Sequence, residues 1–174
     1  MSEREKESRK HCSASDERKS SQWLVRVMVI DASSTIREMV ETCLRSEGFV
    51  VQSFSTGVEA MQRLRQPDVV VPDLIVLNSV LPDVSGYGVV QYIMTKPQFT
   101  HTLILMLMHH NGVVDRLKAR LAGSKSCLAI PFVSQYLLQV ILKMLSSLSA
   151  TSSGKSTSIR DEMNHESSPP YVVW

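Results

Sequence analysis

The sequence predicts an α/β domain built on a parallel five-stranded sheet, and two patterns support this fold class. Short apolar runs rich in β-branched residues alternate five times with segments whose apolar residues recur at helical spacing. Strands that alternate with helices of this length indicate a parallel sheet with helices on both faces. The run at 103–108 is wholly apolar, which is typical of a strand buried on both faces. The chain therefore predicts a doubly wound (βα)5 domain, whose commonest strand order is 2-1-3-4-5.

Recognisable start and stop residues bound these elements. The expected strands cover residues 25–30, 49–54, 74–78, 103–108 and 126–130. The expected helices cover residues 34–47, 56–65, 86–96, 113–122 and 134–148. Ser33 or Ser34 can cap the first helix, Gly48 and Gly123 can end the first and fourth, and Pro97 cannot continue the third. The apolar residues that define the fourth helix are Val113, Val114, Leu117 and Leu121.

The segments outside this domain have the composition of disordered chain. Residues 1–22 mix charged residues and serine with almost nothing apolar, so they can bury too little surface to become ordered. Residues 149–174 are rich in Ser and Thr and are likewise expected to form a disordered tail. The tail ends in the apolar tip Tyr171–Trp174, which is either a docking peptide for another protein or a chance terminus. Residues 23–148 then form the domain.

Composition and charge exclude several classes of function. The formal net charge is only +2, and positive residues do not gather on one predicted helix face, which argues against a nucleic-acid partner. The chain has no apolar run of about 18 residues, so no membrane span is expected, and it shows no secretory signal. Cys12, Cys43 and Cys127 form neither a CxxC pair nor a disulfide ladder. These features predict a cytoplasmic protein with reduced cysteines.

One buried strand carries a polar side chain to the edge where open α/β sheets place their sites. The apolar run Leu74–Leu77 ends in Asn78, and the first strand is followed by Asp31. In the order 2-1-3-4-5 the switch point lies between the first and third strands, so these two side chains share one crevice. His109 and His110 follow the fourth strand, but adjacent residues of an extended chain point to opposite sides, which favours a loop over a metal site.

Several stretches, in order along the chain, resemble one known family. They are residues 27–37, 72–78, 81–87, 115–124 and 130–132. Over roughly residues 25–147 the chain resembles the receiver domain of bacterial two-component response regulators, in particular receivers of the chemotaxis and twitching-motility type. The resemblance implies a flavodoxin-like fold and a place in phosphorelay signal transduction.

The resemblance also implies a site at the carboxyl ends of the strands, where an aspartate accepts a phosphoryl group beside Mg²⁺-binding acids, a hydroxyl and a lysine. Only the first acid is present, as Asp31. The second acid corresponds to Ala32, the nucleophile to Asn78, the hydroxyl to Met108 and the lysine to Ile130. The family's aromatic switch position is Cys127.

These departures predict a degenerate pseudo-receiver that is not an enzyme. An amide is no anionic nucleophile and alanine offers Mg²⁺ no oxygen, so neither a catalytic residue nor a cofactor is expected, and Mg²⁺ binding is expected to be lost. Asp31 is at best a weak cation ligand, and a hydrogen-bonded role near the first helix is favoured. Asp83 is an alternative acceptor, although the turn after Pro82 favours aspartate in any case.

We therefore expect the protein to act through protein–protein contact. The family's partner and dimer surface, formed by the fourth helix, fifth strand and fifth helix, corresponds to about Val113–Leu145. No output domain is recognisable after it. Two alternatives stay open, namely a receiver that accepts phosphate on an unusual residue and a regulatory domain that senses a small molecule.

Overall fold

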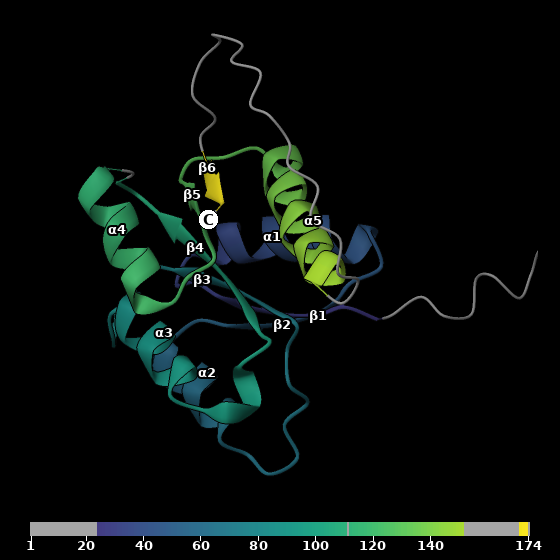
Figure 1. The fold of residues 1–174 in the computed structure, drawn as a ribbon, viewed down its shortest axis with the longest axis vertical. Coiled ribbons are helices and arrows are strands. Elements are labelled where there is room, and N and C mark those ends of the chain that lie inside the picture. The colour runs from purple at the N-terminus through teal and green to yellow at the C-terminus, as the bar shows by residue number, and fades with distance from the viewer. Residues whose placement is uncertain (1–23, 111, 152–170, 174) are drawn as a thin grey trace, which may run out of the picture.

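A computed structural model describes residues 24–110, 112–151 and 171–173, which form one sheet with helices on both faces (Figure 1). The strands are β1 (Arg26–Ile30), β2 (Val50–Phe54), β3 (Leu74–Asn78), β4 (Leu103–Met108), β5 (Ser126–Ala129) and β6 (Tyr171–Val173). The helices are α1 (Ser34–Ser46), α2 (Gly57–Leu64), α3 (Gly86–Met94), the 3-10 helix η2 (Pro97–Phe99), α4 (Val113–Ala122) and α5 (Ser134–Thr151). The first five strands are parallel in the order β2-β1-β3-β4-β5, which confirms the predicted fold class.

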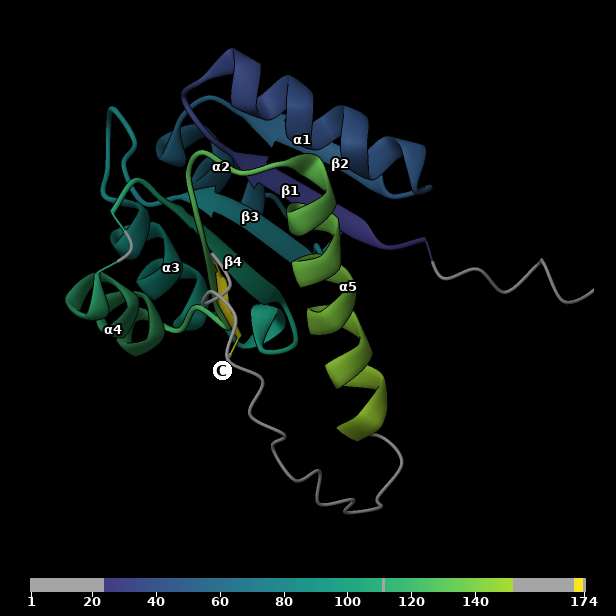
Figure 2. The same cartoon turned by 90° about the horizontal axis from the view of Figure 1, so that it is seen from above.

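Two helical layers cover the sheet. α1 and α5 lie on one face, and α2, α3 and α4 lie on the other (Figures 1 and 2). Consecutive strand residues point to opposite faces, so each strand supplies both cores in alternation. In β1, Met28 and Ile30 face α2–α4, whereas Val27 and Val29 face α1 and α5. All residues of β4 are buried, as the wholly apolar run predicts.

The helix boundaries follow local chemistry. The Ser33 hydroxyl accepts a hydrogen bond from the Ile36 N–H at 3.3 Å, and the Thr56 hydroxyl accepts one from the Glu59 N–H at 3.2 Å. Each hydroxyl thus satisfies an N–H that has no partner within its own helix. Gly123 ends α4 with φ at 113°, a left-handed conformation that favours glycine.

The apolar residues that predict α4 are not the residues that α4 buries. Ala119 and Ala122 face the core, while four larger side chains are exposed. Those four are Val113 (73%), Val114 (63%), Leu117 (54%) and Leu121 (78%). Because the buried side is made of small alanines, α4 can lie close to the sheet and leave its bulky apolar side facing outwards.

The C-terminal tip also differs from expectation. Composition predicts that Tyr171–Val173 belong to a tail outside the domain, whereas these residues form β6, which pairs antiparallel with β5. Helix α5 continues beyond its expected end, to Thr151. The expected disorder of residues 1–22 and 152–170 concerns parts of the chain outside the described residues. Within the described parts, no helix is long and apolar enough to cross a membrane.

Candidate functional site

Strands β1 and β3 bring Asp31 and Asn78 together at one edge of the sheet. The two strands are hydrogen-bonded neighbours, with Ile30 opposite Leu77, so the residue after β1 and the last residue of β3 lie side by side. Both side chains are buried, with 1% of Asp31 and 4% of Asn78 exposed. The two side chains therefore lie together, as the strand order predicts.

The polar atoms of the pair are engaged with each other and with the backbone. The Asn78 Nδ2 donates to Asp31 Oδ2 at 2.9 Å, and Asn78 Oδ1 accepts from the Val80 N–H at 3.0 Å. The other carboxylate oxygen, Oδ1 of Asp31, accepts from the Ser33 N–H at 2.8 Å. These partners fix the orientation of the amide, because a reversed amide would place its oxygen against a carboxylate.

Arg37 is a site residue that sequence reasoning missed. Its Nη1 donates to the carbonyl oxygens of Asp31, at 2.7 Å, and Ala32, at 3.0 Å. The guanidinium therefore holds the β1–α1 turn from the first turns of α1 and brings a positive charge beside Asp31. No motif in the sequence marks this contact, because it depends on a long side chain that reaches back six residues.

The remaining family positions are apolar or peripheral. Ala32 is exposed, whereas Met108 and Cys127 are buried in the core beneath α2–α4, with 1% and 0% exposed. Ile130 is half-buried against the opposite core, and its N–H donates to the Met108 carbonyl at 2.8 Å. Met108 and Ile130 thus adjoin through the backbone, but neither side chain provides a polar atom to the crevice.

The β3–α3 loop keeps the close geometry of the crevice. The Gly86 N–H donates to the Ser79 carbonyl at 3.1 Å. A Cβ on Gly86 would lie 2.3 Å from the Asn78 carbonyl oxygen and 2.8 Å from the Ser79 Cα. Glycine is therefore required here because the start of α3 packs directly on the end of β3.

Asp83 caps α2 from this loop. Its Oδ1 accepts from the Gly57 N–H at 3.1 Å, and its Oδ2 accepts from the Val58 N–H at 2.7 Å. Slight desolvation tends to raise the pKa of this carboxyl, but the hydrogen bonds from Val58 and Gly57 outweigh it and lower the pKa below its ordinary value. Both carboxylate oxygens accept backbone hydrogen bonds, which favours a structural role of Asp83 in the turn over a role as phosphoryl acceptor.

Within the described parts of the chain, the histidines and other potential ligands do not assemble into a metal centre. His109 and His110 are both exposed at the end of β4. Among the residues that the structure describes, no group of three or more His, Cys, Asp and Glu side chains is placed to hold a metal ion.

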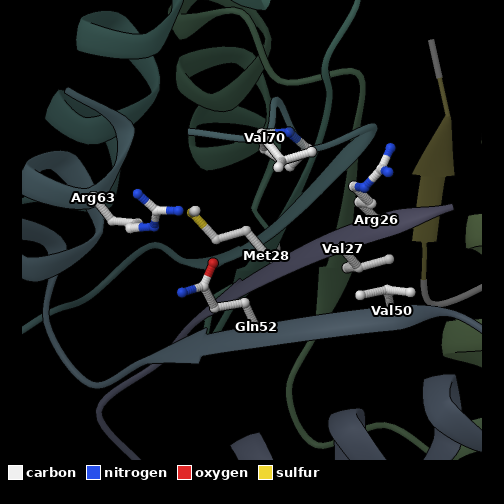
Figure 3. A pocket seen from close by; sticks show the side chains of 8 residues that line it. Arg26, Val27, Met28, Val50, Gln52, Arg63 and Val70 are labelled. Carbon is white, nitrogen blue, oxygen red and sulfur yellow. The ribbon is translucent and has the colours of Figure 1, made fainter. Parts of the chain in front are cut away.

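A hollow of about 200 Å³ lies at the other end of β1, away from Asp31 (Figure 3). It is lined by Arg26, Val27, Met28, Val50, Gln52, Arg63, Val70 and Pro72. Arg63 is paired with Asp68, with Nη1 and Oδ1 3.0 Å apart. The hollow shares no residue with the Asp31–Asn78 pair, so the two are separate features.

The fold and the amino-acid sequence together match one protein family. The model of the response regulator receiver domain matches residues 27–142, and the chain belongs to this family. It is thus a receiver domain of the two-component response regulators.

Individual relatives agree with this assignment. Protein PilG of Pseudomonas aeruginosa is 32% identical over 117 residues, which cover 67% of this chain and 84% of PilG. A probable transcriptional regulator, ycf27 of Guillardia theta, is 31% identical, but the match covers only 40% of its length and 62% of this chain. Among solved structures, the chemotaxis response regulator CheY4 of Vibrio cholerae superposes with a TM-score of 0.65 at 25% identity, over 69% of this chain and 98% of CheY4.

Proposed function

We propose that this receiver domain is a pseudo-receiver that transmits a signal through protein contacts without accepting phosphate. The observation that carries the proposal is the Asn78–Asp31 hydrogen bond of 2.9 Å at the strand ends. At the position where the family has its nucleophile, this chain has a neutral amide that is buried and bonded on both of its polar atoms.

The chemistry of the pair supports this proposal. A carboxamide has no anionic oxygen at neutral pH, so Asn78 cannot form an acyl phosphate. Mg²⁺ prefers several oxygen ligands, whereas Ala32 offers no side-chain oxygen and each Asp31 oxygen already accepts a hydrogen bond. The residues present therefore do not fit the family's Mg²⁺ site, and the proposed function includes no metal and no catalytic step.

A partner surface on the α4 side supports action through contact. Val113, Val114, Leu117 and Leu121 form an exposed apolar side of α4, within the α4–β5–α5 region that corresponds to the family's partner surface. Exposed apolar patches on soluble domains mark interaction sites more often than scattered single residues do. We propose that protein partners, including a second copy of this chain, bind the α4–β5–α5 surface.

The test is phosphorylation by a small donor. The full chain is incubated with acetyl phosphate or phosphoramidate and Mg²⁺, and its intact mass is measured beside a phosphorylation-competent receiver as positive control. We expect no phosphoryl gain in the wild type or in Asn78→Asp, because Ala32, Met108 and Ile130 still provide no metal or phosphate contacts in that variant.

A stoichiometric gain of one phosphoryl group that disappears in Asp31→Asn or Asp83→Asn would overturn the proposal in favour of an unusual acceptor. Rapid Mg²⁺-dependent labelling of Asn78→Asp would show that the surrounding positions are not the obstacle we infer. A rise in melting temperature with one compound of a metabolite panel, lost when Asn78 is substituted, would instead indicate a small-molecule sensor.

A further inference from the structure

The two outer edges of the parallel sheet differ in how they are covered. At one edge no other described strand pairs with the outer side of β2, and Val50 is 48% exposed. At the other edge β5 is overlaid by β6, and Ser126, Cys127 and Leu128 are each 0% exposed. An outer strand presents a row of backbone N–H and C=O groups that can pair with another extended chain. In this structure the C-terminal segment occupies that row on β5.

The pairing has a defined register. Ser126 lies opposite Val173, Cys127 opposite Val172 and Leu128 opposite Tyr171 in an antiparallel ladder. Tyr171, Val172 and Val173 are aromatic or β-branched residues, which favour extended backbone. Pro169 and Pro170 precede them in the sequence and have no N–H. Tyr171 is therefore the first residue after these prolines whose N–H can donate a hydrogen bond to β5.

The position of β6 relates it to the partner surface. β6 lies at the outer side of β5 between α4 and α5 (Figures 1 and 2), and it contacts α5 as well as β5. A partner that approaches the α4–β5–α5 surface therefore meets β6 at the centre of that surface. Adding an extended segment to a sheet edge is a common mode of peptide recognition.

We propose that the β5 edge is a docking site for an extended apolar peptide, and that the chain's own C-terminal strand fills it and competes with partners for it. This inference rests on the proposed function, because it concerns access to the α4–β5–α5 surface that we propose partners bind. The chain between Thr151 and Tyr171 tethers the strand, which raises its effective concentration at β5 to on the order of millimolar. A peptide in trans binds only to the extent that it outcompetes this tethered strand.

The first test empties the edge within the full chain. Consecutive N–H groups of a strand point to opposite sides, so one of any two neighbouring residues of β6 donates to β5. Proline has no N–H, so Tyr171→Pro/Val172→Pro removes at least one hydrogen bond from β6 to β5, whichever of the two N–H groups points to β5. Met163→Pro/Asn164→Pro adds two prolines outside β6 and is the matched control.

The readout is hydrogen exchange at the β5 amides that face β6. We expect faster exchange there in Tyr171→Pro/Val172→Pro than in the wild type and the control, with unchanged exchange in β1 and β3 as the check that the fold is intact. Equal protection of β5 in all three proteins would overturn the contact.

The second test measures competition. A fluorescent peptide of residues 167–174 is titrated with each full-length protein, and its anisotropy is followed. We expect it to bind Tyr171→Pro/Val172→Pro at least tenfold more tightly than the wild type, because the tethered competitor is gone. The same peptide with prolines at positions 171 and 172 should not bind. Equal affinity for wild type and variant would show that the tethered strand does not occupy the site, and no binding to either would show that the edge is not a peptide site.

These outcomes are separable from a failure of the proposed function. Phosphoryl uptake is read as a mass change and involves the strand ends at Asp31 and Asn78, whereas exchange and anisotropy report only on the β5 edge. A chain that takes up phosphate and also binds the peptide would refute the pseudo-receiver and retain the docking site.

Discussion

The Asn78 amide donates to the Asp31 carboxylate across the gap between β3 and β1, with 2.9 Å between Nδ2 and Oδ2. Both side chains are buried, and the bond joins the ends of two adjacent strands. A charge-assisted hydrogen bond in such a place is stronger than a neutral one. The Asp31–Asn78 pair therefore acts as a clamp between the two strands.

The clamp predicts the effect of restoring an aspartate. Asn78→Asp replaces the donor by a second carboxylate beside Asp31, and like charges at this distance cannot both be accommodated without cost. We expect the free energy of unfolding to fall by about 1–3 kcal/mol at pH 7. The two carboxylates repel each other only when both are ionised, so the loss should be small near pH 4 and should grow as pH rises. Urea unfolding of wild type and variant from pH 4 to pH 8 measures this, and a loss that does not depend on pH would contradict the charge argument.

The close approach of α3 to β3 predicts opposite effects for two glycines of the same helix. Gly86→Ala places a Cβ 2.3 Å from the Asn78 carbonyl oxygen, and we expect it to cost about 1–3 kcal/mol. A Cβ on Gly88 meets nothing within 4 Å, so Gly88→Ala should stabilise the domain by about 0.5–1 kcal/mol through helix propensity. Thermal and urea unfolding check both. Equal effects of the two substitutions would mean that the loop adjusts freely.

The α2 cap predicts an acid-dependent contribution from Asp83. Its pKa is lowered in the folded protein, so its contribution to stability is present above the ordinary value of 3.8 and is lost as pH falls through the folded-state pKa. Asp83→Asn can accept through one oxygen only and should be less stable than wild type at pH 6, with the difference shrinking towards pH 3. Glu38→Gln, which changes an exposed acid on α1, is the control. A difference that stays constant from pH 6 to pH 3 would assign the cap no titrating role.

Substitutions on the exposed apolar side of α4 should weaken self-association without changing the free energy of unfolding much. Leu117→Glu should change the free energy of unfolding by no more than about 0.5 kcal/mol, because the side chain is 54% exposed. Ala119→Glu, two residues further on, would bury a charge and should unfold the domain, since Ala119 is 0% exposed. Sedimentation velocity of the full chain should show weaker self-association for Leu117→Glu than for Lys118→Glu, which changes a polar exposed neighbour. Equal self-association of these two variants would remove α4 from the partner surface.

The parallel sheet could be predicted because each of its strands carries a local signal. The run Leu103–Met108 is apolar throughout and becomes a strand buried on both faces, and Leu74–Leu77 ends in the polar residue that reaches the crevice. Helix ends are also marked locally. The hydroxyls of Ser33 and Thr56 cap helix starts, and Gly123 ends α4 in a left-handed conformation. Strand order then follows from the preferences of doubly wound sheets.

Other features could not be predicted, because they depend on contacts between distant residues. Apolar residues recur at helical spacing on two sides of α4, one with Leu117 and one with Ala119. Which side faces the core depends on how α4 packs against α3 and β5. The position of Asn78 opposite Asp31 follows from strand order, but its bond to the Val80 N–H depends on the shape of the loop. Similarly, β6 has only three residues, and nothing local identifies β5 as its partner.

β6 also bears on the solubility of the domain. A long open strand edge invites edge-to-edge aggregation, and natural proteins reduce that hazard by keeping outer strands short. With β6 in place, the outermost strand on that side offers only three residues, Tyr171–Val173, to a neighbouring molecule. The same segment that we propose restricts access by partners therefore also covers backbone groups of β5 that could otherwise pair with a second copy of the domain.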